Sequence, residues 1–185
     1  MDKSFIRHFK YLGLAAAVSA WIFIILSIAN NPWIDLYRDA LSDLGVPEAN
    51  NPWIYNYGLM ITGAILAIYS SYLVWESRTR LEAVGGGYVF IGGIFLALIG
   101  VFYGGTRPHI FVSTYFFVQM GMAILAMGLG TLYRGRVYPR ISILVFLLML
   151  LGVFIEWPSA ALIEIYEILL LDAWVVARTF YYDVE

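Results

Sequence analysis

The chain is a series of long apolar runs separated by short polar breaks. An α-helix needs about 20 apolar residues to cross the hydrocarbon core of a bilayer, and the runs are about that long. Several of them begin just after a proline, where the missing N–H costs least. The pattern predicts six transmembrane helices, at about residues 11–29, 53–75, 86–104, 109–132, 140–157 and 159–178.

Composition supports an all-α membrane protein, a bundle of six transmembrane helices. Of the 185 residues, 62% are hydrophobic and 13% are charged, whereas soluble domains are less apolar and more charged. Six helices use most of the chain, so we expect one transmembrane domain over residues 1–185. A basic start before an apolar run is also typical of a signal peptide, but the run at 11–29 is long enough to span, and we expect a retained helix.

The basic residues are distributed unevenly over the two sides of this topology. Two of them, Arg38 and Arg107, lie on one side, and nine lie on the other. The nine are Lys3, Arg7, Lys10, Arg78, Arg80, Arg134, Arg136, Arg140 and Arg178. Because Lys and Arg concentrate in cytoplasmic loops, we expect a multi-pass protein of the cell membrane with both termini in the cytoplasm. We expect no nucleic-acid partner.

The first outer loop, about residues 30–52, is the longest break. Four apolar residues recur at helical spacing, and polar residues fill the opposite arc. The apolar set is Ile34, Tyr37, Leu41 and Leu44, and the polar set is Asp35, Arg38, Asp39, Ser42 and Asp43. This predicts a short amphipathic helix at about 33–44, lying on the outer face of the membrane. In the alternative reading, the polar face is the solvated side of a lid in which Ser42 or Asp43 binds free backbone N–H groups.

Residues able to do chemistry gather on this outer side. His109 could act as a general acid or base with Asp39 or Asp43, and Ser42 could be a nucleophile. These four are the candidate catalytic residues, although a lone histidine at a helix start is more often a cap. The candidate substrate-binding residues are Arg38, Arg107, Asn56, Glu156, Glu164 and Glu167. No spacing motif indicates a metal site, the two histidines lie on opposite sides, and the sequence indicates no particular cofactor.

Three acids interrupt the last apolar run, Glu164, Glu167 and Asp172. An ionised acid at mid-bilayer costs about 2.5–3.5 kcal/mol, so these groups should face the bundle, pair or stay protonated. Glu164 and Glu167 are three residues apart and share a face, which favours a cavity open to the outer side. They could instead staple helices by bonding Asn, Tyr or Arg. For Asp172 we expect an ion pair with Arg140, Lys10 or Arg178.

The stretch RDALSDLGVPEANNPWIYNYGLMITG resembles the signature of a prokaryotic membrane family, domain of unknown function 998. The matching residues are Ser42, Asp43, Leu44, Gly45, Asn56, Gly58 and Gly63, with Pro108, His109, Phe116 and Phe117 further on. The resemblance extends over the whole chain and implies a topology but no function. A more distant similarity is to Frag/DRAM-type six-helix proteins, some of which remodel the lipid of GPI anchors. That similarity implies a lipid substrate.

Three functions are compatible with these features. The first is an outward-facing polar site that binds or processes a lipid or a lipid-linked headgroup, in which an arginine would hold phosphate; a lipid-modifying hydrolase or transferase is its enzymatic form. The second is a small proton-coupled transporter that uses the acids of the last helix. The third is a structural or assembly subunit. The expected partners are the lipid bilayer and a lipid ligand.

Overall fold

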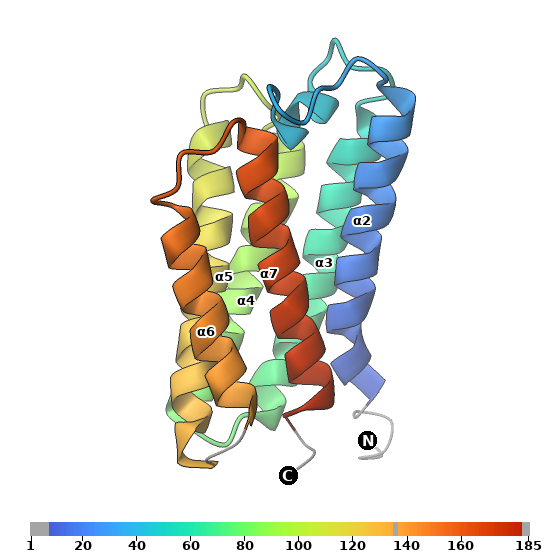
Figure 1. Cartoon of the computed structure of the whole chain (residues 1–185). Coiled ribbons are helices and arrows are strands. Elements are labelled where there is room, and N and C mark those ends of the chain that lie inside the picture. The colour runs from blue at the N-terminus through green and yellow to red at the C-terminus, as the bar shows by residue number, and fades with distance from the viewer. Residues whose placement is uncertain (1–7, 135–136, 183–185) are drawn as a thin grey trace.

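Six α-helices lie side by side in the computed structural model, which describes residues 8–134 and 137–182 (Figure 1). They are α2 (Leu12–Asn30), α3 (Trp53–Glu76), α4 (Arg80–Val101), α5 (His109–Thr131), α6 (Val137–Gly152) and α7 (Ala160–Phe180). Three short 3-10 helices accompany them, η1 (His8–Tyr11), η2 (Leu41–Gly45) and η3 (Leu132–Arg134). No strand occurs within these ranges, so the all-α prediction is confirmed.

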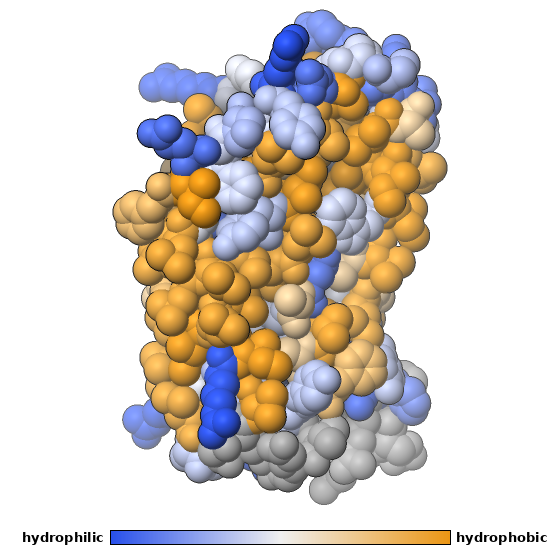
Figure 2. All heavy atoms as spheres, in the orientation of Figure 1, coloured by the Kyte–Doolittle hydropathy of each residue, from blue (hydrophilic) through white to orange (hydrophobic). Residues whose placement is uncertain are grey.

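The bundle has two distinct ends. At one of them α2 begins and α7 ends, and we call this the terminal end. At the other, the loop end, residues 31–52 cross the top of the bundle and carry η2 (Figure 1). Figure 2 shows a broad hydrophobic belt between polar residues at both ends on the face in view. This distribution is typical of a protein that sits in a bilayer.

Four of the segments are long and apolar enough to cross a membrane: His8–Asn30, Trp53–Glu76, Arg80–Val101 and His109–Thr131. They indicate a multi-pass membrane protein. The apolar helix α6 has only 16 residues, or about 24 Å at 1.5 Å per residue. Toward the loop end, it stops well short of α5 and α7 (Figure 1). Helix α7 has 21 residues and carries the three acids.

The helix boundaries differ from the predicted ones at α4 and α6. Helix α4 begins at Arg80 rather than residue 86, because the Thr79 hydroxyl caps it by accepting the backbone N–H of Glu82 at 3.2 Å. Helix α6 runs from Val137 to Gly152 rather than over 140–157, so Pro139 lies inside its first turn, where no intrahelical N–H is lost. Pro52 and Pro108 directly precede α3 and α5, as predicted.

Small residues bring α3 and α4 close together. A Cβ atom on Gly63 would lie 2.4 Å from the carbonyl oxygen of Gly93, and one on Gly93 would lie 2.7 Å from that of Gly63. The two backbones therefore approach closely at these glycines. Helices α5 and α7, in contrast, barely touch each other, and α6 contacts both of them.

The predicted amphipathic helix at 33–44 is wrong. Residues 31–40 form turns, and only Leu41–Gly45 is helical, as 3-10 helix η2. Aspartate side chains take the backbone donors that a helix would use: Asp39 accepts the N–H of Asp35 at 2.7 Å, and Asp43 accepts that of Ala40 at 2.8 Å. Such local bonds compete with a helix. The alternative reading, in which Asp43 binds a free backbone N–H, is confirmed.

Candidate functional site

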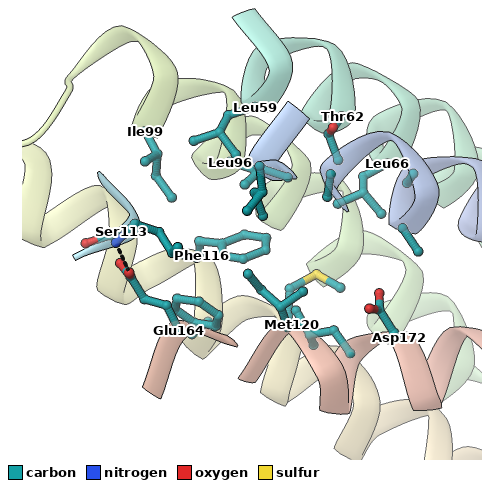
Figure 3. A pocket seen from close by; sticks show the side chains of 18 of the residues that line it. Leu59, Thr62, Leu66, Leu96, Ile99, Ser113, Phe116, Met120, Glu164 and Asp172 are labelled. Atoms are coloured by element: carbon teal, nitrogen blue, oxygen red, sulfur yellow. Dashed lines mark hydrogen bonds between the residues drawn. The ribbon is translucent and has the colours of Figure 1, made fainter. Parts of the chain in front are cut away.

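The interior of the bundle contains a narrow apolar cavity of about 90 Å³, which we call the chamber. Small residues of α2 leave the room for it, namely Gly13, Ala16, Ala17 and Ala20. The other walls come from α3, α4, α5 and α7, and Leu41 of η2 closes the loop end. In Figure 3, Phe116 and Met120 of α5 lie between two carboxylates, Glu164 and Asp172. The chamber is thus an apolar cavity with two carboxylates in its wall.

Glu164 joins the wall of the chamber to the loop that covers it. Its Oε2 accepts a hydrogen bond from the backbone N–H of Leu41 at 2.8 Å, drawn as a dashed line in Figure 3. The alternative reading of the sequence gave this acid an Asn, Tyr or Arg as its partner, but its partner is a backbone N–H. No side-chain pattern marks such a donor, which is why sequence analysis missed it.

Asp172 lies about 12 Å further along α7, at 1.5 Å per residue. It accepts the indole N–H of Trp21 on α2 at 2.7 Å. The predicted ion pair with Arg140, Lys10 or Arg178 is therefore wrong. A single indole donor leaves Asp172 with acceptor capacity on the chamber side, because a carboxylate can accept about four hydrogen bonds.

The loop over the chamber is latched to α3 by the residues of the Ser-Asp-Leu-Gly element. The Asn56 amide donates to the Gly45 carbonyl at 2.9 Å. A Cβ on Gly45 would lie 2.3 Å from the Asn56 Oδ1, so glycine is needed there. Leu41 and Leu44 point inward and are fully buried. The motif builds a lid on the chamber.

Three of the four candidate catalytic residues, Asp39, Asp43 and His109, have hydrogen-bond partners in the backbone. Asp39 and Asp43 accept backbone N–H groups, as described above, and the Asp39 carbonyl also accepts the N–H of Ala161 at 3.0 Å. Ser42 is buried within η2. A ring nitrogen of His109, Nδ1, lies 2.8 Å from the Phe102 carbonyl oxygen at the end of α4. These contacts give each acid and the histidine a role in the fold.

Three candidate substrate-binding residues lie away from the chamber. Arg38 is exposed and pairs with Asp35 at 3.5 Å, three residues earlier. Arg107 and Glu156 are also exposed, in loops at the loop end. None of the three lines the chamber. Of the predicted set, Glu164 lines the chamber and Asn56 holds its lid, while Glu167 faces a groove described below.

At the terminal end, a buried ion pair ties α7 to α3. The Arg178 guanidinium donates to Glu76 at 2.7 Å, and its side chain is only 3% exposed. Its Cζ also lies 3.4 Å from the centre of the Tyr182 ring, a cation–π contact. Sequence analysis missed this ion pair because a basic residue after an apolar run is equally typical of a positive charge at the membrane interface.

Within the described residues, no three His, Asp or Glu side chains are grouped so that they could hold a metal ion. A comparison with protein families matched residues 14–181 to the family described as "Protein of unknown function (DUF998)". The chain belongs to the DUF998 family. The resemblance noted in the sequence is thereby confirmed. Comparisons with curated proteins and with solved structures found no match for this DUF998 protein.

Proposed function

We propose that this DUF998 protein binds the apolar chain of a lipid in the chamber. The observation that carries the proposal is an apolar cavity under the lid, with two carboxylates and little other polarity in its wall. Ligand sites are typically apolar concavities with a few placed polar groups. The chamber volume of about 90 Å³ is smaller than that of most ligand sites, so the chamber takes only a short part of a slender apolar chain, beside Phe116 and Met120 (Figure 3).

The acids also favour a class of headgroup. Glu164 and Asp172 line the chamber, and no Lys or Arg does so among its lining residues. Carboxylates repel phosphate and accept hydrogen bonds from hydroxyl or ammonium groups. Arg38 and Arg107, which the phosphate hypothesis requires, are exposed outside the chamber. We therefore propose a neutral or cationic donor group on the lipid rather than a phosphate bound inside.

The proposal includes an orientation. All six helices span the membrane, the loop end faces outward, and both termini are cytoplasmic, because nine of the eleven basic residues fall on one side of a six-helix topology. Helix α7 spans despite its acids because Glu164, Glu167 and Asp172 face the interior of the bundle or the groove rather than open lipid. The lid therefore covers the chamber from the outer side.

Filling the chamber tests the proposal. Ala20→Phe places a ring in the chamber, while Val18→Phe, on the exposed face of the same helix, is the matched control. The proteins are purified gently, and the bound lipid is extracted and counted by mass spectrometry. We expect about one retained lipid per chain in the wild type and in Val18→Phe, and loss of that lipid in Ala20→Phe. Equal retention in all three proteins contradicts the proposal.

A proton-coupled transporter is the second candidate. The observation in its favour is that Glu164 and Asp172, about 12 Å apart along α7, line the same cavity. Intramembrane acids in series are typical of proton relays. In proteoliposomes with an imposed pH gradient, this function predicts a proton flux that Glu164→Gln and Asp172→Asn each abolish. A flux indifferent to both substitutions, or no flux, excludes it.

A further inference from the structure

A second cavity lies between α5, α6 and α7, and its lining shares Ser113, Phe117 and Glu164 with that of the chamber. This groove has a volume of about 560 Å³, within the range of small-molecule sites. Phe117 and Gly121 of α5, Met149 and Val153 of α6, and Ile163 and Glu167 of α7 contribute to its walls. It exists because α6 covers a seam at which α5 and α7 barely touch.

The groove opens sideways. Several of its lining residues are exposed at the surface of the bundle, among them Val118, Leu150 and Val153. In addition, α6 ends below the outer ends of its neighbours (Figure 1), so the groove's outer part has less cover. In a bilayer such an opening faces the acyl chains, and a ligand would enter it from the membrane.

Glu167 lines this groove and carries an unused acceptor. The residue is 5% exposed, and its Oε1 has no hydrogen-bond partner. That oxygen lies beside Gly152 of α6, where a Cβ would be 3.2 Å away. Burying an unpaired carboxylate oxygen is costly, and the cost is removed when a ligand supplies the donor. The other acid lining the groove, Glu164, already accepts the N–H of Leu41.

We infer that the groove binds a single-chain cationic amphiphile, whose ammonium group donates to Glu167 and whose apolar chain lies between α5 and α6. The charge argument selects a cation, because within residues 8–134 and 137–182 no Lys or Arg lines the groove to neutralise its two acids. An ammonium offers three donors and a full positive charge, and charge-assisted hydrogen bonds are the stronger kind. The inference concerns a second site and stands apart from lipid binding in the chamber.

Equilibrium binding of two probes tests this inference. Labelled dodecylamine, which is protonated at neutral pH, and labelled dodecanol share a chain and differ in charge. Binding is measured to the full-length protein in nanodiscs of neutral lipid, with empty nanodiscs subtracted. We expect the wild type to bind the amine about tenfold or more tightly than the alcohol. Equal affinities overturn the inference.

Two variants locate the binding. Glu167→Gln keeps the shape and removes the charge, and we expect it to abolish the preference for the amine. Gly121→Leu fills the groove, where a Cβ meets its first neighbour at 3.9 Å and so fits without a clash. We expect it to abolish binding of both probes. Gly87→Leu on α4 is the matched control, because Gly87 has nothing within 4 Å and lies outside the groove.

The inference is overturned if Glu167→Gln keeps the amine preference, or if Gly121→Leu and Gly87→Leu bind the probes equally well. Size-exclusion profiles and thermal midpoints confirm that each variant is folded. Failure here is distinguishable from failure of the proposed function, since Ala20→Phe blocks the chamber and leaves the groove intact. Loss of the retained lipid in Ala20→Phe would therefore support lipid binding in the chamber even if the groove showed no preference for the amine.

Discussion

The Glu164 carboxylate on α7 accepts the backbone N–H of Leu41 in η2, across 123 residues of chain, at 2.8 Å. This bond fixes the lid to the wall of the chamber. Replacing Glu164 by Leu leaves that N–H without an acceptor, which costs about 1–3 kcal/mol. Glu164→Leu is expected to speed hydrogen exchange in residues 36–45, and Glu164→Gln, which keeps an acceptor oxygen, is expected to do so less.

The exposed Glu156 supplies the control for this experiment. Glu156→Leu is expected to leave exchange in the same segment unchanged. If Glu164→Leu also leaves it unchanged, the lid is held by other contacts, and Glu164 is not its latch.

A second prediction concerns Gly45. A methyl group there would meet the Asn56 Oδ1 at 2.3 Å and the Tyr55 ring at 3.0 Å. The Asn56 side chain must then move and lose its bond to the Gly45 carbonyl, at a cost of about 1 kcal/mol. Gly45→Ala is expected to lower the thermal midpoint in detergent.

Gly87→Ala is the matched substitution, because the space around Gly87 is open. It is expected to raise the midpoint, since alanine in a helix interior is better than glycine by about 0.5–1 kcal/mol. The two glycines should thus respond with opposite signs. A higher midpoint for Gly45→Ala would show that the lid tolerates a side chain there.

A third prediction compares two ion pairs. The Arg178–Glu76 pair has side chains 3% and 15% exposed, whereas the Arg38–Asp35 pair has side chains 83% and 47% exposed. Removing one member of a buried pair costs about 3–5 kcal/mol, and an exposed pair contributes about 1 kcal/mol or less. Arg178→Ala should therefore destabilise strongly and Arg38→Ala hardly at all, by thermal unfolding.

The double variant Arg178→Met with Glu76→Met separates charge from packing. Because replacing both members of a buried pair by apolar groups is often neutral, it is expected to recover much of the loss. A double variant as unstable as Arg178→Ala would assign the effect to the ring contact with Tyr182 rather than to the buried charge.

A fourth prediction concerns the unused acceptor of Glu167. Removing a buried polar group that lacks a partner should stabilise the ligand-free protein. Glu167→Leu is expected to raise the thermal midpoint of the delipidated protein. A large decrease would mean that Glu167 holds the fold together, and it would weaken the case for a ligand in the groove.

Helix number and order follow directly from the apolar runs and their prolines, because length and hydropathy dominate in a membrane. The lid does not. The spacing of Ile34, Tyr37, Leu41 and Leu44 fits a helix, but aspartates at 35, 39 and 43 bind the backbone instead. Periodicity alone gives no measure of that local competition.

The candidate site, too, could be predicted only in part from the sequence. Sequence analysis placed Glu164 and Glu167 on one shared face, and both line the groove. It did not find the Leu41 N–H or the Trp21 indole as partners, since each requires knowing which helices are neighbours. The chamber also depends on small residues of α2, which in sequence look like ordinary packing positions.

Photo-cross-linking tests the central claim, that a lipid chain occupies the chamber. A long-chain lipid carrying a diazirine is incorporated, activated by light, and the adducts are mapped by mass spectrometry. The account predicts adducts on Leu59, Phe116 and Met120, which line the chamber, and their loss in Ala20→Phe but not in Val18→Phe. Adducts confined to outward residues such as Ile61 and Ile68, in all three proteins alike, would contradict it.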